Sequence, residues 1–224
     1  MSKIKVVIPA KINSIRVPKK NIKLLGGKPL VSYMIETCKK VFPSKDIYVY
    51  SNSDILKEIA NRYEIQFLKE SDELASPDTL IDDAIYDVLC RLECDYLIQA
   101  NPTAPFVSNK QLQEFSDILV SDEYDVLNSV KEIQIECTYR GKPINFNPHS
   151  KMISSANLIP VYADVAALYG FKTSICKYNY EKYGYFIYGR KKDKTNSYIL
   201  DGYSSIDIDT EEDFRLAEHI MNYA

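Results

Sequence analysis

The chain has 224 residues, a net charge of −3 and a hydrophobic fraction of 46%, a composition typical of a folded domain. This length fits one α/β domain with room for a modest insertion. Net acidity without a long basic tract argues against a nucleic-acid partner. No stretch approaches the roughly 20 consecutive apolar residues that span a bilayer, and no secretory signal is recognisable, so we expect a cytoplasmic protein with no membrane partner.

Strand and helix patterns alternate along the first 130 residues. The elements expected in chain order are a strand at 3–10, a helix at 30–41, a strand at 46–50, a helix at 53–63, a strand at 65–68, a helix at 79–92 capped by Asp78, a strand at 96–99, a helix at 110–120 and a strand at 125–130. This alternation predicts an α/β fold whose mostly parallel sheet has helices on both faces and ligands at the carboxyl ends of its strands.

The rhythm breaks after residue 131. Residues 132–160 contain several Pro, Asn and Ser residues, which predict an irregular arm or insertion. Residues 204–222 then predict a strand followed by a helix. We expect all of these elements to form a single domain that spans residues 1–224.

Basic residues gather at the start of the chain. Eight of them precede the first carboxylate, Glu36: Lys3, Lys5, Lys11, Arg16, Lys19, Lys20, Lys23 and Lys28. A buried strand that leads into a basic loop and then a helix is a common way to hold phosphate groups. A solvated basic face is the alternative, and the apolar run at residues 6–8 makes it the weaker one.

Two aspartates near the end of the chain predict a cation site. On a strand, Asp207 and Asp209 would share one face, and a pair of carboxylates suits Mg²⁺, which keeps waters and substrate phosphates as its other ligands. Thr210 would then begin a helix, with Asp213 as the acidic member of a capping box. The alternative is that the two aspartates only solvate the end of a strand.

Cysteine and histidine offer little material for a zinc site or for histidine-based catalysis. The five cysteines are odd in number and scattered, and the closest pair, Cys90 and Cys94, has no histidine nearby. We expect buried, reduced thiols. The histidines are His149 and His219.

A tyrosine-rich segment occupies residues 178–188, with Tyr178, Tyr180, Tyr183, Tyr185 and Tyr188. Tyrosine can stack on nucleic-acid bases, but it is also favoured in strands and at protein interfaces. A dimer interface or a strand surface is therefore the favoured interpretation.

Several motifs, taken in order, resemble one family. Residues 8–21 read IPAKINSIRVPKKN and residues 24–30 read LLGGKPL. Residues 73–75 with 78–79 resemble an E-L-A-x-D-T segment that carries one extra residue, Ser76 or Pro77. Residues 101–106 read NPTAPF, and residues 207–218 begin D-I-D-T. Together they resemble the cytidylyltransferases that activate acidic sugars, namely the CMP-acylneuraminate and CMP-Kdo synthetases.

The resemblance implies a Rossmann-like nucleotidyltransferase fold and a homodimer joined through the arm. It implies Mg²⁺-dependent transfer of CMP from CTP to an anionic acceptor, an acidic sugar, with release of pyrophosphate, for surface glycan biosynthesis. On these motifs, nucleotide binding is assigned to Pro9, Ala10, Lys11, Ser14, Asn21, Lys69, Ala75 and Thr79, catalysis to Lys11, Arg16, Lys20 and Asn101, and Mg²⁺ to Asp207 and Asp209.

Some positions depart from the family pattern. Lys11 stands in place of an arginine and so loses the bidentate fork on phosphate. Ile12 and Asn13 replace turn glycines, and Asn101 replaces a glutamine. On the acceptor side, an arginine is replaced by Val107 and an asparagine by Val165. These changes keep two alternatives open: a non-sugar phosphate or phosphonate acceptor, and a relative that binds a nucleotide without turning it over.

Overall fold

A seven-stranded sheet forms the centre of the computed structural model, which describes residues 2–14, 16–76 and 78–223. Pro77, one candidate for the extra residue, lies outside the described residues. The strand order is β11-β7-β10-β6-β1-β4-β5. Only β10 runs antiparallel to its neighbours among these paired strands. The strands are β1 (Ile4–Pro9), β4 (Ile47–Ser51), β5 (Gln66–Lys69), β6 (Tyr96–Ala100), β7 (Val126–Ile133), β10 (Val161–Lys172) and β11 (Thr195–Ile199).

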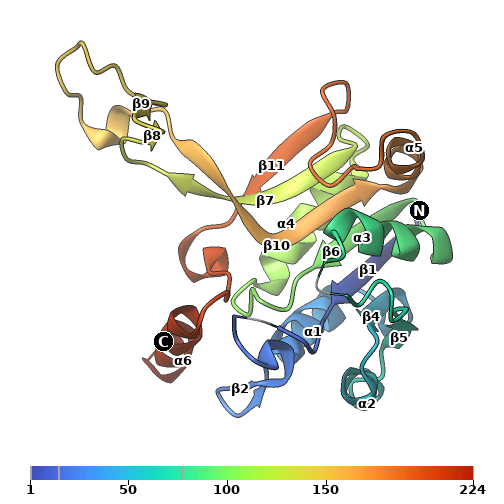
Figure 1. Cartoon of the computed structure of the whole chain (residues 1–224). Helices are drawn as coiled ribbons and strands as arrows, with labels where there is room; N and C mark the ends of the chain where they lie inside the picture. Colours follow the sequence, from blue (N-terminus) through green and yellow to red (C-terminus); the bar gives the residue numbers. More distant parts are fainter. Residues whose placement is uncertain (1, 15, 77, 224) are drawn as a thin grey trace.

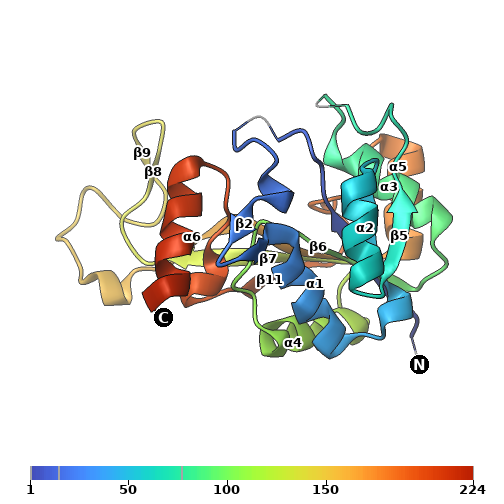
Figure 2. The same ribbon diagram turned by 90° about the horizontal axis from the view of Figure 1, so that it is seen from below.

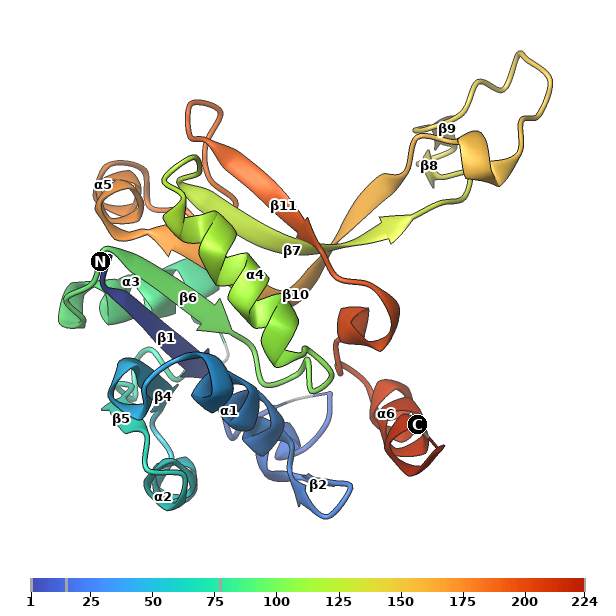
Figure 3. The ribbon, with the colours of Figure 1, turned by 180° about the vertical axis from the view of Figure 1, so that it is seen from behind.

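Helices cover both faces of this sheet, as the sequence predicts. One face packs against α1 (Leu30–Val41), α2 (Asp54–Arg62) and α4 (Asn109–Val120), which Figure 3 shows in part. The other face packs against α3 (Ile81–Arg91) and α5 (Thr173–Tyr183), as Figure 1 shows. Within the described ranges, no helix is both long and apolar enough to cross a membrane.

A third, smaller apolar cluster holds the C-terminal helix α6 (Glu211–Tyr223). It packs Phe214 and Ala217 of this helix against Val17 and Leu25. Leu25 belongs to a short hairpin of β2 (Leu24–Leu25) and β3 (Lys28–Pro29). Figure 2 shows α6 and β2 on the same side of the molecule. The chain therefore brings its last helix back to the loop that follows its first strand.

An arm projects from the sheet at residues 132–160. The outer halves of β7 and β10 continue past the sheet as a two-stranded ribbon (Figure 1), which pairs Val161 with Ile133. Beyond the ribbon lie β8 (Thr138–Tyr139), β9 (Lys142–Pro143) and the short 3-10 helix Ser155–Asn157. The expected arm is present, but regular strands carry it.

A bulge interrupts β10 where the arm meets the sheet. The register with β7 shifts between Asp164 and Tyr169. The buried hydroxyl of Ser129 spans the irregularity, since it donates to Val165 O at 2.6 Å and accepts from Leu168 N at 2.9 Å. An internal side chain thus replaces the missing ladder bonds.

Two expected details near the cleft are wrong. Helix α3 begins at Ile81 after Leu80, whose side chain makes no capping bond, so Asp78 does not cap it. Residues 206–209 form no strand. They leave a 3-10 helix, Gly202–Ser205, as an extended segment whose Ile208 N donates to Thr103 O at 2.9 Å. The segment is thus bonded to a loop instead of a sheet.

The capping box at the start of α6 is confirmed. The Asp213 carboxylate accepts from Thr210 N at 2.8 Å, and Thr210 Oγ1 accepts from Asp213 N at 3.2 Å. The thiols differ from expectation: all five cysteines are free, but only Cys38 and Cys176 are buried.

The tyrosine-rich segment contains no strand among its described residues. Tyr178, Tyr180 and Tyr183 lie on α5. Tyr180 stacks on Tyr86 of α3 with ring centroids 3.9 Å apart and donates to Asp83 at 2.5 Å. One of these tyrosines therefore joins α5 to α3 within the monomer.

The close approach of α4 to β10 can be tested at Gly170. A Cβ at this position would lie 2.9 Å from both δ carbons of Leu119 and 3.1 Å from Phe115. Gly170→Ala should lower the free energy of unfolding by about 1–3 kcal/mol, because an extra methyl overfills a packed core. Denaturant unfolding measures this. The double variant with Leu119→Ala should lose less than the sum of the two single variants, and simple additivity would contradict the contact.

Candidate active site

A cleft of about 480 Å³ opens at the carboxyl ends of β1, β4 and β6. Parallel sheets commonly bind ligands at this edge. The cleft brings together residues of three regions: the loop after β1, the loop after β6 and the segment before α6. Of the residues assigned from sequence, it is lined by Pro9, Ala10, Lys11, Ser14, Arg16, Lys20, Asn21, Thr79, Asn101, Asp207 and Asp209.

The basic loop is held in place by its own hydrogen bonds. Asn21 Nδ2 donates to Lys11 O at 2.8 Å. Lys11 Nζ in turn donates to the carbonyls of Ser76 at 3.0 Å and Leu74 at 3.4 Å. Lys11 therefore ties the loop after β1 to the segment around residue 75, and these bonds fix one wall of the cleft.

The loss of the turn glycines carries no backbone strain at Ile12 or Asn13. Neither is among the described non-glycine residues with positive φ. The left-handed residue of this stretch is Lys19, at φ 55°, where a side chain costs about 1–2 kcal/mol. The loop thus makes its turn later than the family pattern would predict.

The two aspartates lie beside two cations. Asp209 Oδ1 is 2.8 Å from Arg16 and 3.2 Å from Lys20 Nζ. Lys20 is 8% exposed and also donates to Ile208 O at 2.5 Å. Asp207 Oδ1 is buried with no hydrogen-bond partner among the described residues. Burial raises the pKa of Asp207, the charge of Asp209 raises it further, and a hydrogen bond with Thr103 opposes both.

Asn101 is held by a chain of amides. Its Nδ2 donates to Ala166 O at 2.6 Å, and its Oδ1 accepts from Gln99 Nε2 at 2.9 Å. A backbone carbonyl can only accept, so it fixes the orientation of both amides. Gln99 Oε1 is left buried in the cleft without a partner in the described chain. The shorter side chain of Asn101 is thereby compensated by its bonds to the bulge of β10.

Two assigned residues do not line the cleft. Lys69 is exposed and lies at a different hollow, beside Asn52 and Lys57. Adjacent residues of an extended chain point to opposite sides, so it is Glu70 that enters the cleft. Ala75 lies in the loop held by Lys11, where its N donates to Ser71 O at 3.0 Å.

The acceptor-side departures lie in the core. Val165 is 6% exposed and Val107 is 2% exposed, and both belong to the cluster under α1 and α4. At the bulge it is Ala166, the next residue, that lines the cleft. Neither valine therefore offers a side chain to a ligand.

Sequence reasoning missed most of the opposite wall. Tyr50, Glu70, Gln99, Tyr169 and Tyr188 also line the cleft. Three of these follow a rule that was available: Tyr50, Gln99 and Glu70 lie at or just after the carboxyl ends of parallel strands. Tyr169 and Tyr188 had no such signal, because β10 was not predicted.

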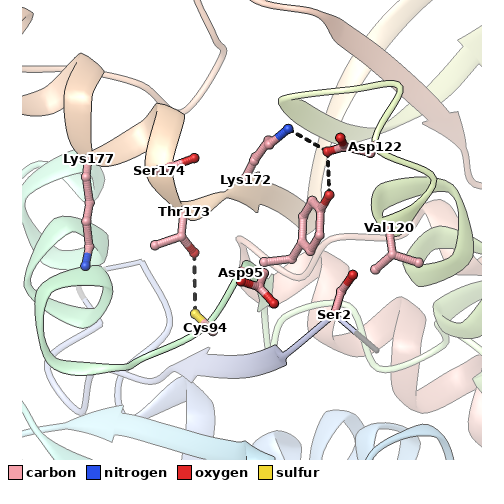
Figure 4. A pocket seen from close by; sticks show the side chains of 10 residues that line it. Ser2, Cys94, Asp95, Val120, Asp122, Lys172, Thr173, Ser174 and Lys177 are labelled. Carbon is pink, nitrogen blue, oxygen red and sulfur yellow. Dashed lines mark hydrogen bonds and ion pairs between the residues drawn. The ribbon is translucent and has the colours of Figure 1, made fainter.

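A second cleft, of about 620 Å³, lies at the other end of the sheet (Figure 4). Its polar groups satisfy one another. Asp122 accepts from Lys172 at 2.5 Å and from Tyr96 at 2.6 Å, and Cys94 lies 3.4 Å from Thr173 Oγ1. None of its described lining residues carries a buried polar atom without a partner. The cleft at the carboxyl ends is therefore the candidate site.

Solved structures share this architecture. A CMP:2-keto-3-deoxy-manno-octonic acid synthetase complexed with CTP superposes with a TM-score of 0.71 at 15% identity, with 99% of each chain covered. A 4-diphosphocytidyl-2C-methyl-D-erythritol synthase from Anaerococcus prevotii gives 0.73 at 17% identity, over 99% of this chain and 96% of the other. These similarities establish the Rossmann-like nucleotidyltransferase fold.

Curated proteins are similar over nearly the whole chain. An N-acylneuraminate cytidylyltransferase of Streptococcus agalactiae is 25% identical over 93% of this chain and 51% of its own length, so the chain spans about half of that relative. A CMP-N,N'-diacetyllegionaminic acid synthase of Legionella pneumophila is 25% identical over 96% and 94%. A pseudaminic acid cytidylyltransferase of Campylobacter jejuni is 27% identical over 95% and 93%.

The family model described as cytidylyltransferase matches residues 5–215, a span that begins in β1, contains every residue of the cleft and ends within α6. The chain therefore belongs to the cytidylyltransferase family.

Proposed function

We propose that this protein is a Mg²⁺-dependent cytidylyltransferase that transfers CMP from CTP to an acidic sugar and releases pyrophosphate. One observation carries the proposal. The cleft unites two carboxylates, Asp207 and Asp209, with the cations Arg16 and Lys20, from segments almost 190 residues apart in sequence. A family member that turns over a nucleoside triphosphate needs both kinds of group, whereas a protein that only binds a nucleotide has less need of two carboxylates.

The basic loop would bind the triphosphate. The acceptor oxygen would attack the α-phosphorus in line, and the bond to the departing pyrophosphate would break. Lys11, Arg16 and Lys20 would stabilise the negative charge that develops on this leaving group. Arg16 and Lys20 would exchange their present contact with Asp209 for contacts with phosphate oxygens.

The donor set fits Mg²⁺. Asp207 has an oxygen with no protein partner, and Asp209 lies on the same side of the segment, in the same cleft. No group of three or more His, Cys, Asp or Glu in the described ranges is arranged to hold a metal. Phosphate oxygens and waters would therefore complete the coordination, as is common for Mg²⁺. The ion would neutralise phosphate charge and position the nucleophile.

An acidic sugar is the acceptor that the relatives support, since the three named above act on acylneuraminic, legionaminic and pseudaminic acids. The positions of Val107 and Val165 in the core remove the reason to expect a non-sugar phosphate or phosphonate, because neither residue faces the cleft. The product, a CMP-activated sugar acid, suits surface glycan biosynthesis.

We also propose that the arm joins two copies of the chain. Large apolar side chains are exposed along it, and such a patch is typical of an interaction surface. They are Ile135 at 59%, Tyr139 at 64%, Ile144 at 55%, Met152 at 89%, Ile153 at 51% and Ile159 at 79%.

The nucleotide half of the proposal predicts selective stabilisation. CTP with Mg²⁺ at about 100 times its Kd should raise the free energy of unfolding by about 2.7 kcal/mol, and CTP alone should raise it less. Thermal unfolding with each of the four nucleoside triphosphates, with and without Mg²⁺, measures this. No shift with any nucleotide would contradict the proposal.

Asp209→Asn should lower turnover by about 100-fold or more, the scale of losing one electrostatic contact to a transition state. Binding of CTP without Mg²⁺ should persist, because Arg16 and Lys20 remain and lose only a competing carboxylate. Pyrophosphate release and thermal shift measure the two quantities. Glu212→Gln, exposed on the first turn of α6, is the control. Near-normal turnover of Asp209→Asn would refute the metal assignment.

The dimer proposal predicts that Ile159→Glu gives a monomer, because a charge would be buried in an apolar interface. Light scattering after size-exclusion chromatography measures the mass. Ile55→Glu, at a 50% exposed position of α2, should leave the dimer intact. A monomeric unmodified protein at micromolar concentration would contradict the proposal.

A further inference from the structure

Glu70 is a buried carboxylate inside the candidate active site. The residue is 1% exposed, yet it lines the cleft. Its backbone is fixed, because its N donates to Ser51 O at 2.9 Å just beyond the end of β4. Its Oε2 has no hydrogen-bond partner among the described residues. A buried carboxylate without a partner is costly, and such groups concentrate at functional sites.

The neighbours of Glu70 do not compensate its charge. Burial raises its pKa, and the charge of Lys11 only partly opposes this. The Lys11 ammonium is already bonded to the carbonyls of Ser76 and Leu74. Asp87 is a second carboxylate and raises the pKa of Glu70 further, while its own partners are Tyr50 at 3.0 Å and Arg91 at 2.8 Å. Glu70 therefore needs a donor from outside the protein.

The surroundings of Glu70 suit a flat, neutral ring. Tyr50 is buried against the sheet, and Ala84 and Ile81 line the cleft from the start of α3. The cations for phosphate come from the loop after β1. A carboxylate repels phosphate, so a nucleotide bound with its phosphates on that loop would turn its uncharged end toward Glu70.

We propose that Glu70 determines nucleotide specificity by accepting a hydrogen bond from the 4-amino group of cytosine. Cytosine carries an N–H donor at position 4, whereas uracil carries a carbonyl oxygen there. An ionised carboxylate accepts from the first and repels the second, and sites that hydrogen-bond one partner reject the analogue that leaves a buried group unpaired. This inference rests on the proposed use of CTP and is independent of the acceptor.

Glu70→Gln tests this assignment, because it keeps the shape and exchanges one acceptor for a donor. The ratio of kcat/KM for CTP over UTP should fall at least tenfold, since the new amide can donate to the uracil oxygen. The melting temperature of the unliganded variant should rise, because a buried charge without a partner is removed. Nucleotide titrations by thermal shift give the same comparison without turnover. Asp72→Asn, exposed in the following loop, should change neither quantity.

Three other results would overturn the assignment. An unchanged CTP to UTP ratio would show that Glu70 does not contact the base. An equal loss with both nucleotides would indicate a ribose contact, and 2′-deoxy-CTP and 3′-deoxy-CTP would then lose the sensitivity to the substitution. A lower melting temperature would show that Glu70 has an internal partner. By contrast, an unmodified protein that binds no nucleotide would refute the proposed function itself.

Discussion

A single buried ammonium group joins the two ends of this chain at the cleft. Lys20 Nζ donates to Ile208 O at 2.5 Å and lies 3.2 Å from Asp209 Oδ1. A cation buried to this degree is tolerated only with such partners. Because Ile208 N is bonded in turn to Thr103 O, this lysine links the loop after β1, the loop after β6 and the segment before α6. The geometry of the candidate metal site depends on that link.

The charge of the cleft is divided. Lys11, Arg16 and Lys20 place positive charge on the loop after β1, while Glu70 lies beside apolar side chains near the start of α3. Between them, Gln99 and Asn101 offer neutral amides held by the bulge of β10. A ligand with one strongly anionic end and one neutral, hydrogen-bonding end can bind this arrangement in one direction only. The fold thereby selects an orientation before any reaction begins.

Local patterns predict the regular parts of this structure well. The helix at residues 30–41 is found with the expected bounds, and the capping box of Thr210 and Asp213 is found as expected, because both depend on residues within one turn of each other. The basic loop and the acidic pair also meet as their positions at the carboxyl ends of strands predict.

What the sequence could not predict depends on contacts between distant residues. Alternation at residues 206–209 fits a strand, but only the bond from Ile208 to Thr103 shows that the segment pairs with a loop. One residue of phase separates the predicted Lys69 from the observed Glu70 at the cleft. Val165 fits the motif position in sequence, but the bulge buries it and exposes Ala166 instead. Each difference is a matter of side-chain direction that only tertiary contacts fix.

The small apolar cluster beneath α6 has a consequence for dynamics. It is separate from the two large clusters that flank the sheet, and segments with few buried contacts open at lower free energy than the core. Amide hydrogens of α6 should therefore exchange with solvent sooner than those of β1 or β6. Opening of this one helix would release Ile208 from the cluster and separate the carboxylates from the basic loop while the sheet stays folded. The aspartates of the cleft are thus carried by the part of the chain with the least cooperative support.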